Sequence, residues 1–261
     1  MTRDWSSLYK RLRGGFFLSS MACVTDGTFC AQRGSGCAMV QLGAYLAEPP
    51  AYSLKVHKIP VLPADKDSCI SFLKNEFLKV REALGNKVVI CMNLATIKLE
   101  WGLEAAEFFY EAGGDIVEWN FHGTYEPYYK QGKLKAMVYP ENRDELFKWL
   151  NALGDVEKPI IVKFRAGAIP DYTPIMDFIK NLDLFGVHFN IRGENLEPDY
   201  KFIGNIRKKY PEIFLLVSGY LWKPEAVKRV FDIGVDMVGV AEPTIKDSKF
   251  IENLKEKFER L

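Results

Sequence analysis

Several short segments of the chain carry polar side chains at alternate positions. These residues are Glu118, Asn120 and His122 in one segment, Lys163 and Arg165 in a second, His188, Asn190 and Arg192 in a third, and Asn93 in a fourth. Side chains two residues apart point to the same face of a β-strand. Each segment therefore predicts a strand with one polar and one apolar face. A face that gathers carboxylate, imidazole and amine groups can transfer protons, bind anions or hold a metal ion.

Lys163 and Glu118 are the most informative of these residues. An inward-facing lysine within a strand is costly unless an anion or an electron-rich ring lies beside it. Glu118 has two interpretations that the sequence leaves open, a buried ion pair with Lys163 or Arg165, or a role in function. Glu118, His122 and His188 together also form a mixed nitrogen and oxygen set suited to zinc or another divalent ion.

Eight segments rich in β-branched and aromatic residues alternate with segments of helical spacing. The predicted strands are 16–21, 37–44, 87–95, 116–122, 159–166, 185–191, 214–220 and 237–241. Apolar residues recur with helical spacing over 70–84, 175–182 and 251–261, and a short helix is expected over 27–33. Eight strand and helix units in about 250 residues predict a (β/α)8 TIM barrel, with an open doubly wound sheet as the alternative. We expect one domain over residues 1–261.

Composition limits the class of protein. The chain has 261 residues, 48% of them hydrophobic, and a formal net charge of +1. The near-neutral charge argues against a polyanion-binding surface. The N-terminal segment does not resemble a signal peptide and no apolar run is long enough to span a bilayer, so we expect a cytoplasmic protein without membrane attachment. The five cysteines have no CxxC spacing and predict no disulfide framework.

Glycines near the ends of the last two predicted strands suggest a phosphate site. Ser218 and Gly219 close the seventh strand just before a helix with Pro224 near its start, and Gly239 lies in the eighth strand. Backbone N–H groups and a helix N-terminus at these positions bind phosphate in many barrels. Taken alone, glycine at a strand end more often reflects turn geometry.

Five segments resemble the tRNA-dihydrouridine synthases, in the same order along the chain. They are MACVTD at 21–26, DIVEWN at 115–120, VKFR at 162–165, GVH at 186–188 and GVDMVGVA at 234–241. The likeness extends to the FMN-binding barrels that include dihydroorotate dehydrogenase. The segments 26–30 and 42–45 look most like an archaeal branch of these proteins.

The resemblance implies a TIM barrel that binds FMN across its strand ends. Met21, Asn93, Lys163, Arg165 and His188 would contact the cofactor, and the backbone around Ser218, Gly219, Gly239 and Val240 would hold its phosphate. It implies an oxidoreductase that transfers a hydride between FMN and a C=C bond of a small, pyrimidine-like substrate, with NAD(P)H as the electron donor. Lys163 and Asn120 would take part in catalysis.

Two positions depart from the synthase pattern. Gly123 stands where the synthases have a proton-donating cysteine, and His122 beside it is the candidate replacement acid. Glu242 follows the eighth strand where the relatives have Gly-Arg, and its carboxylate would repel an FMN phosphate unless it turns away.

More than one function is compatible with the sequence. The chain ends with its eighth helix, without the synthases' C-terminal RNA-binding helical domain, so RNA is not an expected partner. Synthase-type activity on RNA remains the alternative within the family. A metal-dependent barrel using Glu118, His122 and His188, and a ligand-binding barrel without catalysis, also stay open. The sequence does not indicate the substrate or the oligomeric state.

Overall fold

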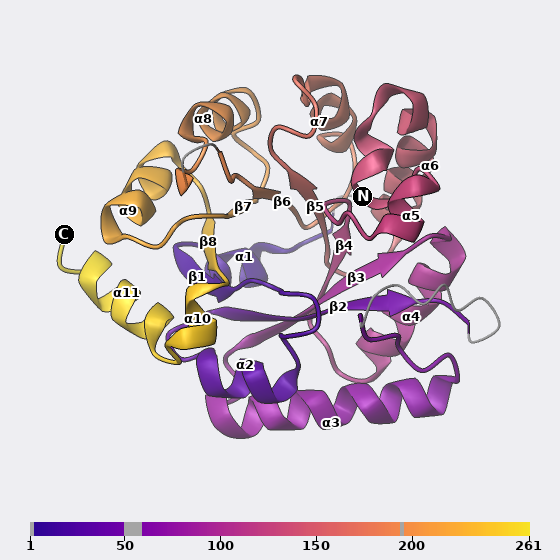
Figure 1. Cartoon of the computed structure of the whole chain (residues 1–261), viewed down its shortest axis with the longest axis horizontal. Coiled ribbons are helices and arrows are strands. Elements are labelled where there is room, and N and C mark those ends of the chain that lie inside the picture. The colour runs from indigo at the N-terminus through magenta and orange to yellow at the C-terminus, as the bar shows by residue number, and fades with distance from the viewer. Residues whose placement is uncertain (1–2, 50–58, 194–195) are drawn as a thin grey trace.

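The computed structural model, which describes residues 3–49, 59–193 and 196–261, is a closed barrel of parallel strands surrounded by helices (Figure 1). Within these residues the barrel has eight strands: β1 (Gly15–Leu18), β2 (Met39–Ala47), β3 (Val89–Thr96), β4 (Ile116–Asn120), β5 (Ile160–Arg165), β6 (Gly186–Asn190), β7 (Leu215–Ser218) and β8 (Met237–Val240). Each strand pairs with its sequence neighbours, and β1 pairs with β8. The predicted (β/α)8 barrel is confirmed, and the open sheet is wrong because the sheet closes.

Helices surround the barrel, and the first of them precedes β1 and lies at one end of the barrel (Figure 1). They are α1 (Ser6–Leu12), α2 (Gly27–Arg33), α3 (Lys66–Leu84), α4 (Leu99–Glu111), α5 (Glu126–Lys130), α6 (Arg143–Asp155), α7 (Thr173–Ile179), α8 (Tyr200–Lys209), α9 (Pro224–Ile233), α10 (Pro243–Lys246) and α11 (Phe250–Phe258). Two 3-10 helices, η2 (Leu134–Val138) and η3 (Pro140–Asn142), lie between α5 and α6.

Local sequence signals explain where several helices begin and end. Pro174 and Pro224 lie in the first turns of α7 and α9, as expected. Gly85 ends α3 with φ of 76°, a conformation that favours glycine. Gly154 lies inside α6, which continues to Asp155. His57, which we interpret as a residue of a polar loop, lies outside the described residues.

The N-terminal end of the barrel interior is apolar. Its buried side chains include Phe17, Met39, Val89, Ile116, Ile161 and Met237. Helix α1 covers this end, and Tyr9 stacks on Phe185 and Phe214 with ring centroids 4.7 and 4.8 Å apart. This helix was not predicted from the sequence, because it is short and mostly polar. Since this end is filled and covered, the polar strand residues lie toward the opposite end.

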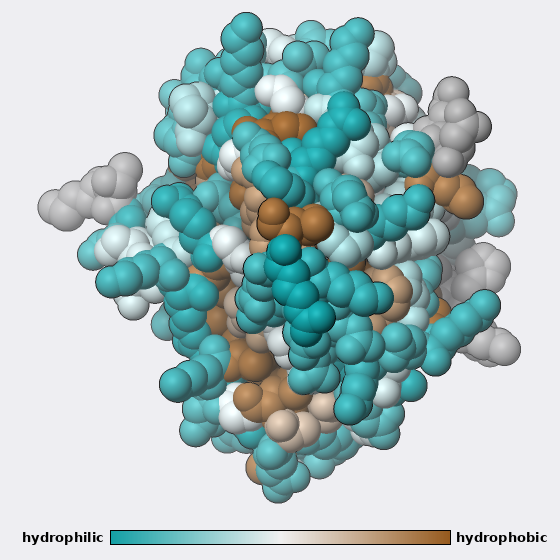
Figure 2. Space-filling model, turned by 90° about the vertical axis from the view of Figure 1, so that its left-hand side faces the viewer, coloured by the Kyte–Doolittle hydropathy of each residue, from teal (hydrophilic) through white to brown (hydrophobic). Residues whose placement is uncertain are grey.

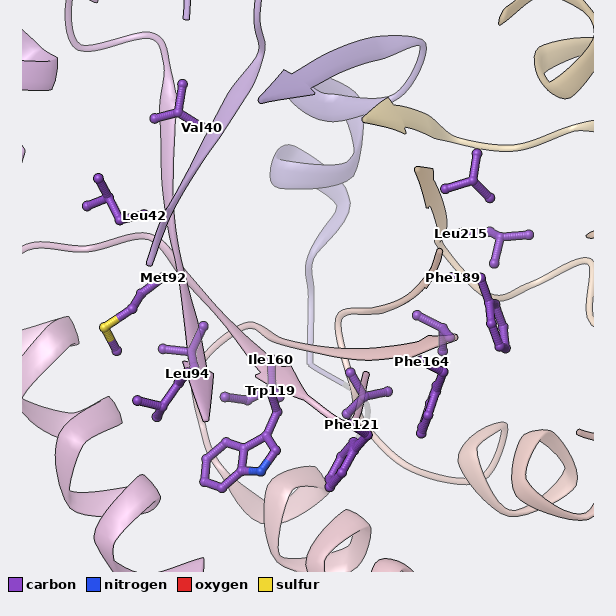
Figure 3. Packing of buried hydrophobic residues seen from close by; sticks show 14 of the residues in the cluster. Val40, Leu42, Met92, Leu94, Trp119, Phe121, Ile160, Phe164, Phe189 and Leu215 are labelled. Atoms are coloured by element: carbon purple, nitrogen blue, oxygen red, sulfur yellow. The ribbon is translucent and has the colours of Figure 1, made fainter. Parts of the chain in front are cut away.

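The main hydrophobic core lies between the strands and the helices. Figure 3 shows outward-facing side chains of neighbouring strands, including Met92, Trp119, Phe121 and Phe164, in this layer. Phe121 stacks on Phe164, with ring centroids 5.6 Å apart. This packing confirms the predicted alternation, because the residues between these apolar ones point into the barrel.

Trp119 packs against the backbone of α4 at Gly102. A Cβ atom at Gly102 would lie 2.3 Å from the Trp119 ring, whereas a Cβ at Gly204, inside α8, would meet nothing within 4 Å. We therefore expect Gly102→Ala to lower the free energy of unfolding by about 1–3 kcal/mol through overpacking. Gly204→Ala is the matched control and should raise it by about 0.5–1 kcal/mol. Urea denaturation checks both, and equal effects would contradict this description of the packing.

The outer surface is largely polar. On the side of the molecule formed by the C-terminal helices, hydrophilic side chains predominate around a smaller strip of hydrophobic ones (Figure 2). Among the described residues, no helix is both long enough and apolar enough to cross a membrane.

Candidate functional site

A cavity of about 500 Å³ opens at the C-terminal end of the barrel. Strand residues from the predicted inward face line it: Asn93, Asn120, Lys163, Arg165, Asn190, Ser218 and Gly239 are among them. The loops after the strands add Ser20, Met21, His122, Gly123, Tyr125, Lys135, Arg192, Gly219, Trp222 and Glu242. The size lies within the usual range for small-molecule sites.

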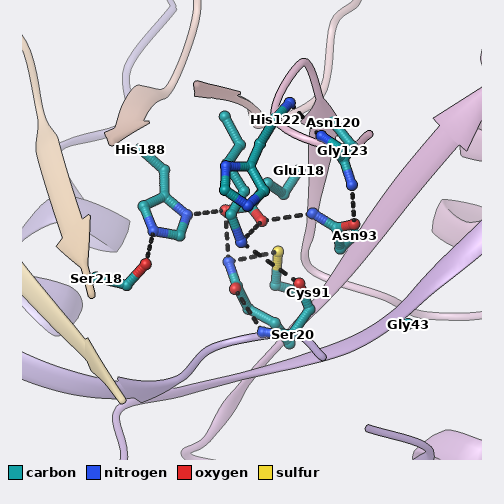
Figure 4. Close-up of polar contacts among 12 residues, drawn as sticks. Ser20, Gly43, Cys91, Asn93, Glu118, Asn120, His122, Gly123, His188 and Ser218 are labelled. Atoms are coloured by element: carbon teal, nitrogen blue, oxygen red, sulfur yellow. Dashed lines mark hydrogen bonds and ion pairs between the residues drawn. The ribbon is translucent and has the colours of Figure 1, made fainter. Parts of the chain in front are cut away.

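Glu118 lies at the centre of a polar network beneath this cavity (Figure 4). One carboxylate oxygen accepts a hydrogen bond from Asn93 Nδ2 at 2.7 Å and lies 3.2 Å from Lys163 Nζ. The other accepts from Gln41 Nε2 at 2.6 Å and lies 2.5 Å from His188 Nδ1. The carboxylate is fully buried, and four donors satisfy it.

These partners decide the ionisation of Glu118. Burial would raise the pKa of its carboxyl group, but Lys163, His188 and the hydrogen bonds together hold that pKa well below its usual range. Glu118 is therefore ionised at neutral pH. Because the pKa is depressed in the folded state, this charge stabilises the fold above the usual glutamate range, and the stabilisation is lost as the pH falls toward the lowered pKa.

His188 lies on the predicted inward face, below the cavity floor. It is fully buried beneath the cavity and does not line it, because Nδ1 contacts Glu118 and Nε2 lies 2.8 Å from Ser218 Oγ. Burial lowers the pKa of the imidazole, against the opposing effect of Glu118. A neutral ring that donates from Nδ1 and accepts at Nε2 fits both contacts. His188 thus positions Glu118 and Ser218.

The metal site considered from the sequence does not form. Among the described residues, no group of three or more His, Cys, Asp and Glu side chains is arranged to hold a metal ion. Glu118 and His188 are hydrogen-bonded to each other, and the second nitrogen of His188 is engaged by Ser218. The prediction from strand alternation placed these residues on the correct face, but it could not give their distances or partners.

His122 lies at the cavity wall, but its environment does not suit a proton donor. Burial lowers the pKa of its imidazole well below the usual value, and Lys163 and Arg165 lower it further. The ring is therefore neutral at neutral pH. Its Nδ1 is buried and has no hydrogen-bond partner among the described residues. Burial and two cations therefore oppose the protonation of His122, and its role as an acid stays a prediction that this environment disfavours.

Asn120 shapes the loop that carries His122. Its Oδ1 accepts hydrogen bonds from the backbone N–H groups of His122 and Gly123 at 2.9 and 2.8 Å. Its Nδ2 donates to Asn93 Oδ1 at 2.9 Å. Asn120 therefore couples this loop to the network around Glu118.

The space beside Gly123 contains the ring of Tyr125. A Cβ atom at Gly123 would lie 3.3 Å from Cε2 and Cζ of that ring. Burial raises the pKa of the Tyr125 phenol to about 12, helped by the nearby Cys23 and opposed by a hydrogen bond with Asn120. The structure thus places a neutral O–H group near Gly123. Tyr125 was missed from the sequence because an isolated tyrosine in a loop has no distinctive spacing.

The predicted phosphate region contains an ion pair between Arg192 and Glu242. Ser218, Gly219 and Gly239 line the cavity, whereas Val240 packs in the outer core. Arg192, after β6, forms an ion pair with Glu242, after β8. Glu242 therefore remains at the cavity, with its charge balanced by Arg192.

Comparisons with known proteins show what this architecture resembles. Neither protein-family models nor curated protein sequences match the chain. Among solved structures, a mutant of morphinone reductase in complex with tetrahydroNAD matches with a TM-score of 0.71 and 13% identity, over 94% of this chain and 87% of that one. The likeness is one of fold.

Lyases share the same fold at lower similarity. N-acetylneuraminate lyase from Fusobacterium nucleatum has a TM-score of 0.58 and 11% identity, over 95% of this chain and 75% of that one. The Mycoplasma synoviae enzyme has a TM-score of 0.56 and 12% identity, over 95% and 72%. The chain therefore has a TIM-barrel fold found in both oxidoreductases and lyases, and identity this low carries no reaction across.

Proposed function

We propose that the protein is an FMN-dependent oxidoreductase that reduces a C=C bond of a small substrate. The observation that carries the proposal is the Lys163 ammonium group, 3% exposed, held by Glu118 at the floor of the C-terminal cavity. A positive charge in this position suits the electron-rich edge of a flavin ring.

The cavity lining has donors suited to a flavin. Ser20, Asn93 and Lys163 provide hydroxyl, amide and ammonium groups on its floor, and Met21 provides an apolar contact. Gly219 offers the phosphate a glycine turn beside Arg192, whereas the hydroxyl proton of Ser218 is donated to His188. FMN, when bound, supplies the hydride. NAD(P)H is the proposed electron donor.

The protein's own part in the reaction is to orient the ring and deliver a proton. Glu118 fixes Lys163, and Asn93 links both to Asn120. The neutral Tyr125 phenol then donates a proton from its oxygen to the substrate carbon that does not receive the hydride. His122 remains neutral and contributes a hydrogen bond from the cavity wall.

Glu242 offers a test of the phosphate position. In Glu242→Gln, Arg192 loses its charged partner and a nearby negative charge disappears, so FMN affinity should rise about 2- to 5-fold. Riboflavin, which has no phosphate, should bind both proteins equally. Fluorescence titration with the two flavins measures this, and equal shifts for FMN and riboflavin would place the phosphate elsewhere.

A lyase is the second candidate, because Lys163 is an amine within a cavity that a carbonyl compound can enter. Imine formation needs Nζ as a free amine, whereas the ion pair with Glu118 uses the ammonium form.

One experiment separates the two functions. The purified chain is mixed with FMN, and separately with a small 2-oxo acid followed by borohydride. The oxidoreductase predicts a yellow complex that survives gel filtration and no change in protein mass. A mass increase located at Lys163, without retained flavin, would instead establish the lyase.

A further inference from the structure

The charges around the cavity do not balance. Its lining includes four basic side chains, Lys135, Lys163, Arg165 and Arg192. Lys163 pairs with Glu118 and Arg192 pairs with Glu242. No carboxylate among the described residues lies within ion-pair distance of Lys135 or Arg165. With His122 neutral, the cavity therefore has an excess of two positive charges.

These two cations lie on one side of the cavity and have fixed backbones. Arg165 ends β5, and its carbonyl oxygen accepts a hydrogen bond from the Tyr172 hydroxyl at 2.6 Å. Lys135 belongs to η2, and its N–H donates to the Gly123 carbonyl at 3.1 Å. This bond attaches η2 to the loop after β4. Since β4 and β5 are adjacent strands, both cations belong to one part of the cavity rim.

A third polar residue, His122, also lines this cavity. Its Nδ1 is buried without a hydrogen-bond partner among the described residues and is not open to the cavity in this structure. A ligand oxygen bound beside it would accept hydrogen bonds from the Arg165 guanidinium and the Lys135 ammonium.

This group of residues is separate from the proposed phosphate region. Ser218 ends β7 and Gly239 lies in β8, and β6 stands between them and β5. The two groups of residues therefore belong to different strands of the barrel end, and the test below separates an oxyanion of the substrate from the flavin phosphate.

We infer that Lys135 and Arg165 bind an oxyanion group of the substrate beside His122, so that the substrate is a small carboxylate or phosphate ester. The inference that this oxyanion belongs to the substrate of a C=C reduction rests on the proposed function. The inference that the cavity binds an oxyanion does not. Arginine matches the planar geometry of a carboxylate or phosphate, and Lys135 adds a second charge. The neutral C=C end of the substrate then extends over the cavity floor toward Lys163.

Calorimetric titration of the flavin-free chain with malonate and with inorganic phosphate tests the inference. Saturable binding of at least one anion is expected, and the preferred anion identifies the oxyanion. Lys135→Met and Arg165→Met should each weaken that binding about 10-fold or more. Lys130→Met is the matched control, since Lys130 pairs with Glu126 on an exposed helix face, and it should change nothing.

The outcomes separate this inference from the proposed function. No anion binding, or equal binding by all variants, overturns the inference. A loss of FMN affinity in Lys135→Met and Arg165→Met without a loss of riboflavin affinity would assign the two cations to the cofactor phosphate, which also overturns it. Anion binding that depends on both cations in a chain that takes up no flavin would uphold the subsite and refute the oxidoreductase.

Discussion

Replacing Lys163 with methionine is expected to lower the free energy of unfolding by about 3–5 kcal/mol, because it leaves the Glu118 carboxylate buried without its ammonium partner. FMN affinity should also fall, about 10-fold or more, through the lost contact with the ring. Denaturation in urea and flavin titration measure the two effects. The stability loss should be largest at neutral pH and smaller near about pH 4, because protonation of Glu118 in the variant removes the uncompensated charge.

The double variant Glu118→Gln with Lys163→Met separates these two effects. It removes both buried charges, so most of the stability should return, whereas the affinity for FMN should not. If flavin affinity recovered together with stability, Lys163 would act only as a structural ion-pair partner. That result would remove the main support for the oxidoreductase.

Replacing Tyr125 with phenylalanine is expected to slow the reduction of an activated C=C bond by about 10²- to 10⁴-fold. The variant loses the phenolic hydroxyl group and its hydrogen bond with Asn120 but keeps the ring, so flavin binding and reoxidation of the reduced flavin by oxygen should be unchanged. Stopped-flow mixing of the reduced protein with 2-cyclohexenone, a simple conjugated enone, measures the step. Because the pKa of the phenol is about 12, the wild-type rate should not fall with pH up to about pH 10.

His122→Gln is the control for this assignment. The neutral imidazole supplies a hydrogen bond and not a proton, so its loss should slow the reaction by less than about 10-fold. A large loss in His122→Gln with an unaffected Tyr125→Phe would reverse the two roles.

The barrel could be predicted from the sequence because each strand follows a simple period. Apolar residues such as Trp119 and Phe164 alternate with polar ones, and this pattern gives both the strands and the face that each side chain occupies. The same pattern correctly placed Glu118, Lys163 and His188 in the barrel interior.

The depth and the partners of these residues could not be predicted in the same way. His188 and Asn93 have the same inward orientation, yet only Asn93 lines the cavity. Gln41, which donates to Glu118, was missed because its strand is otherwise apolar. Tyr125 depends on the path of a loop that local sequence does not define. Distances and pKa shifts depend on the assembled barrel, so the lowered pKa of His122 could not be predicted from the sequence.

The most direct test of the flavin proposal is the visible absorption spectrum of the purified full chain titrated with FMN, with riboflavin titrated in parallel. We expect one bound FMN per chain with a Kd of about 1 μM or tighter, and a weaker affinity for riboflavin. If about 1 mM FMN caused no spectral shift and no flavin were retained, the proposal would be contradicted. The cavity around Lys163 would then bind a ligand other than FMN.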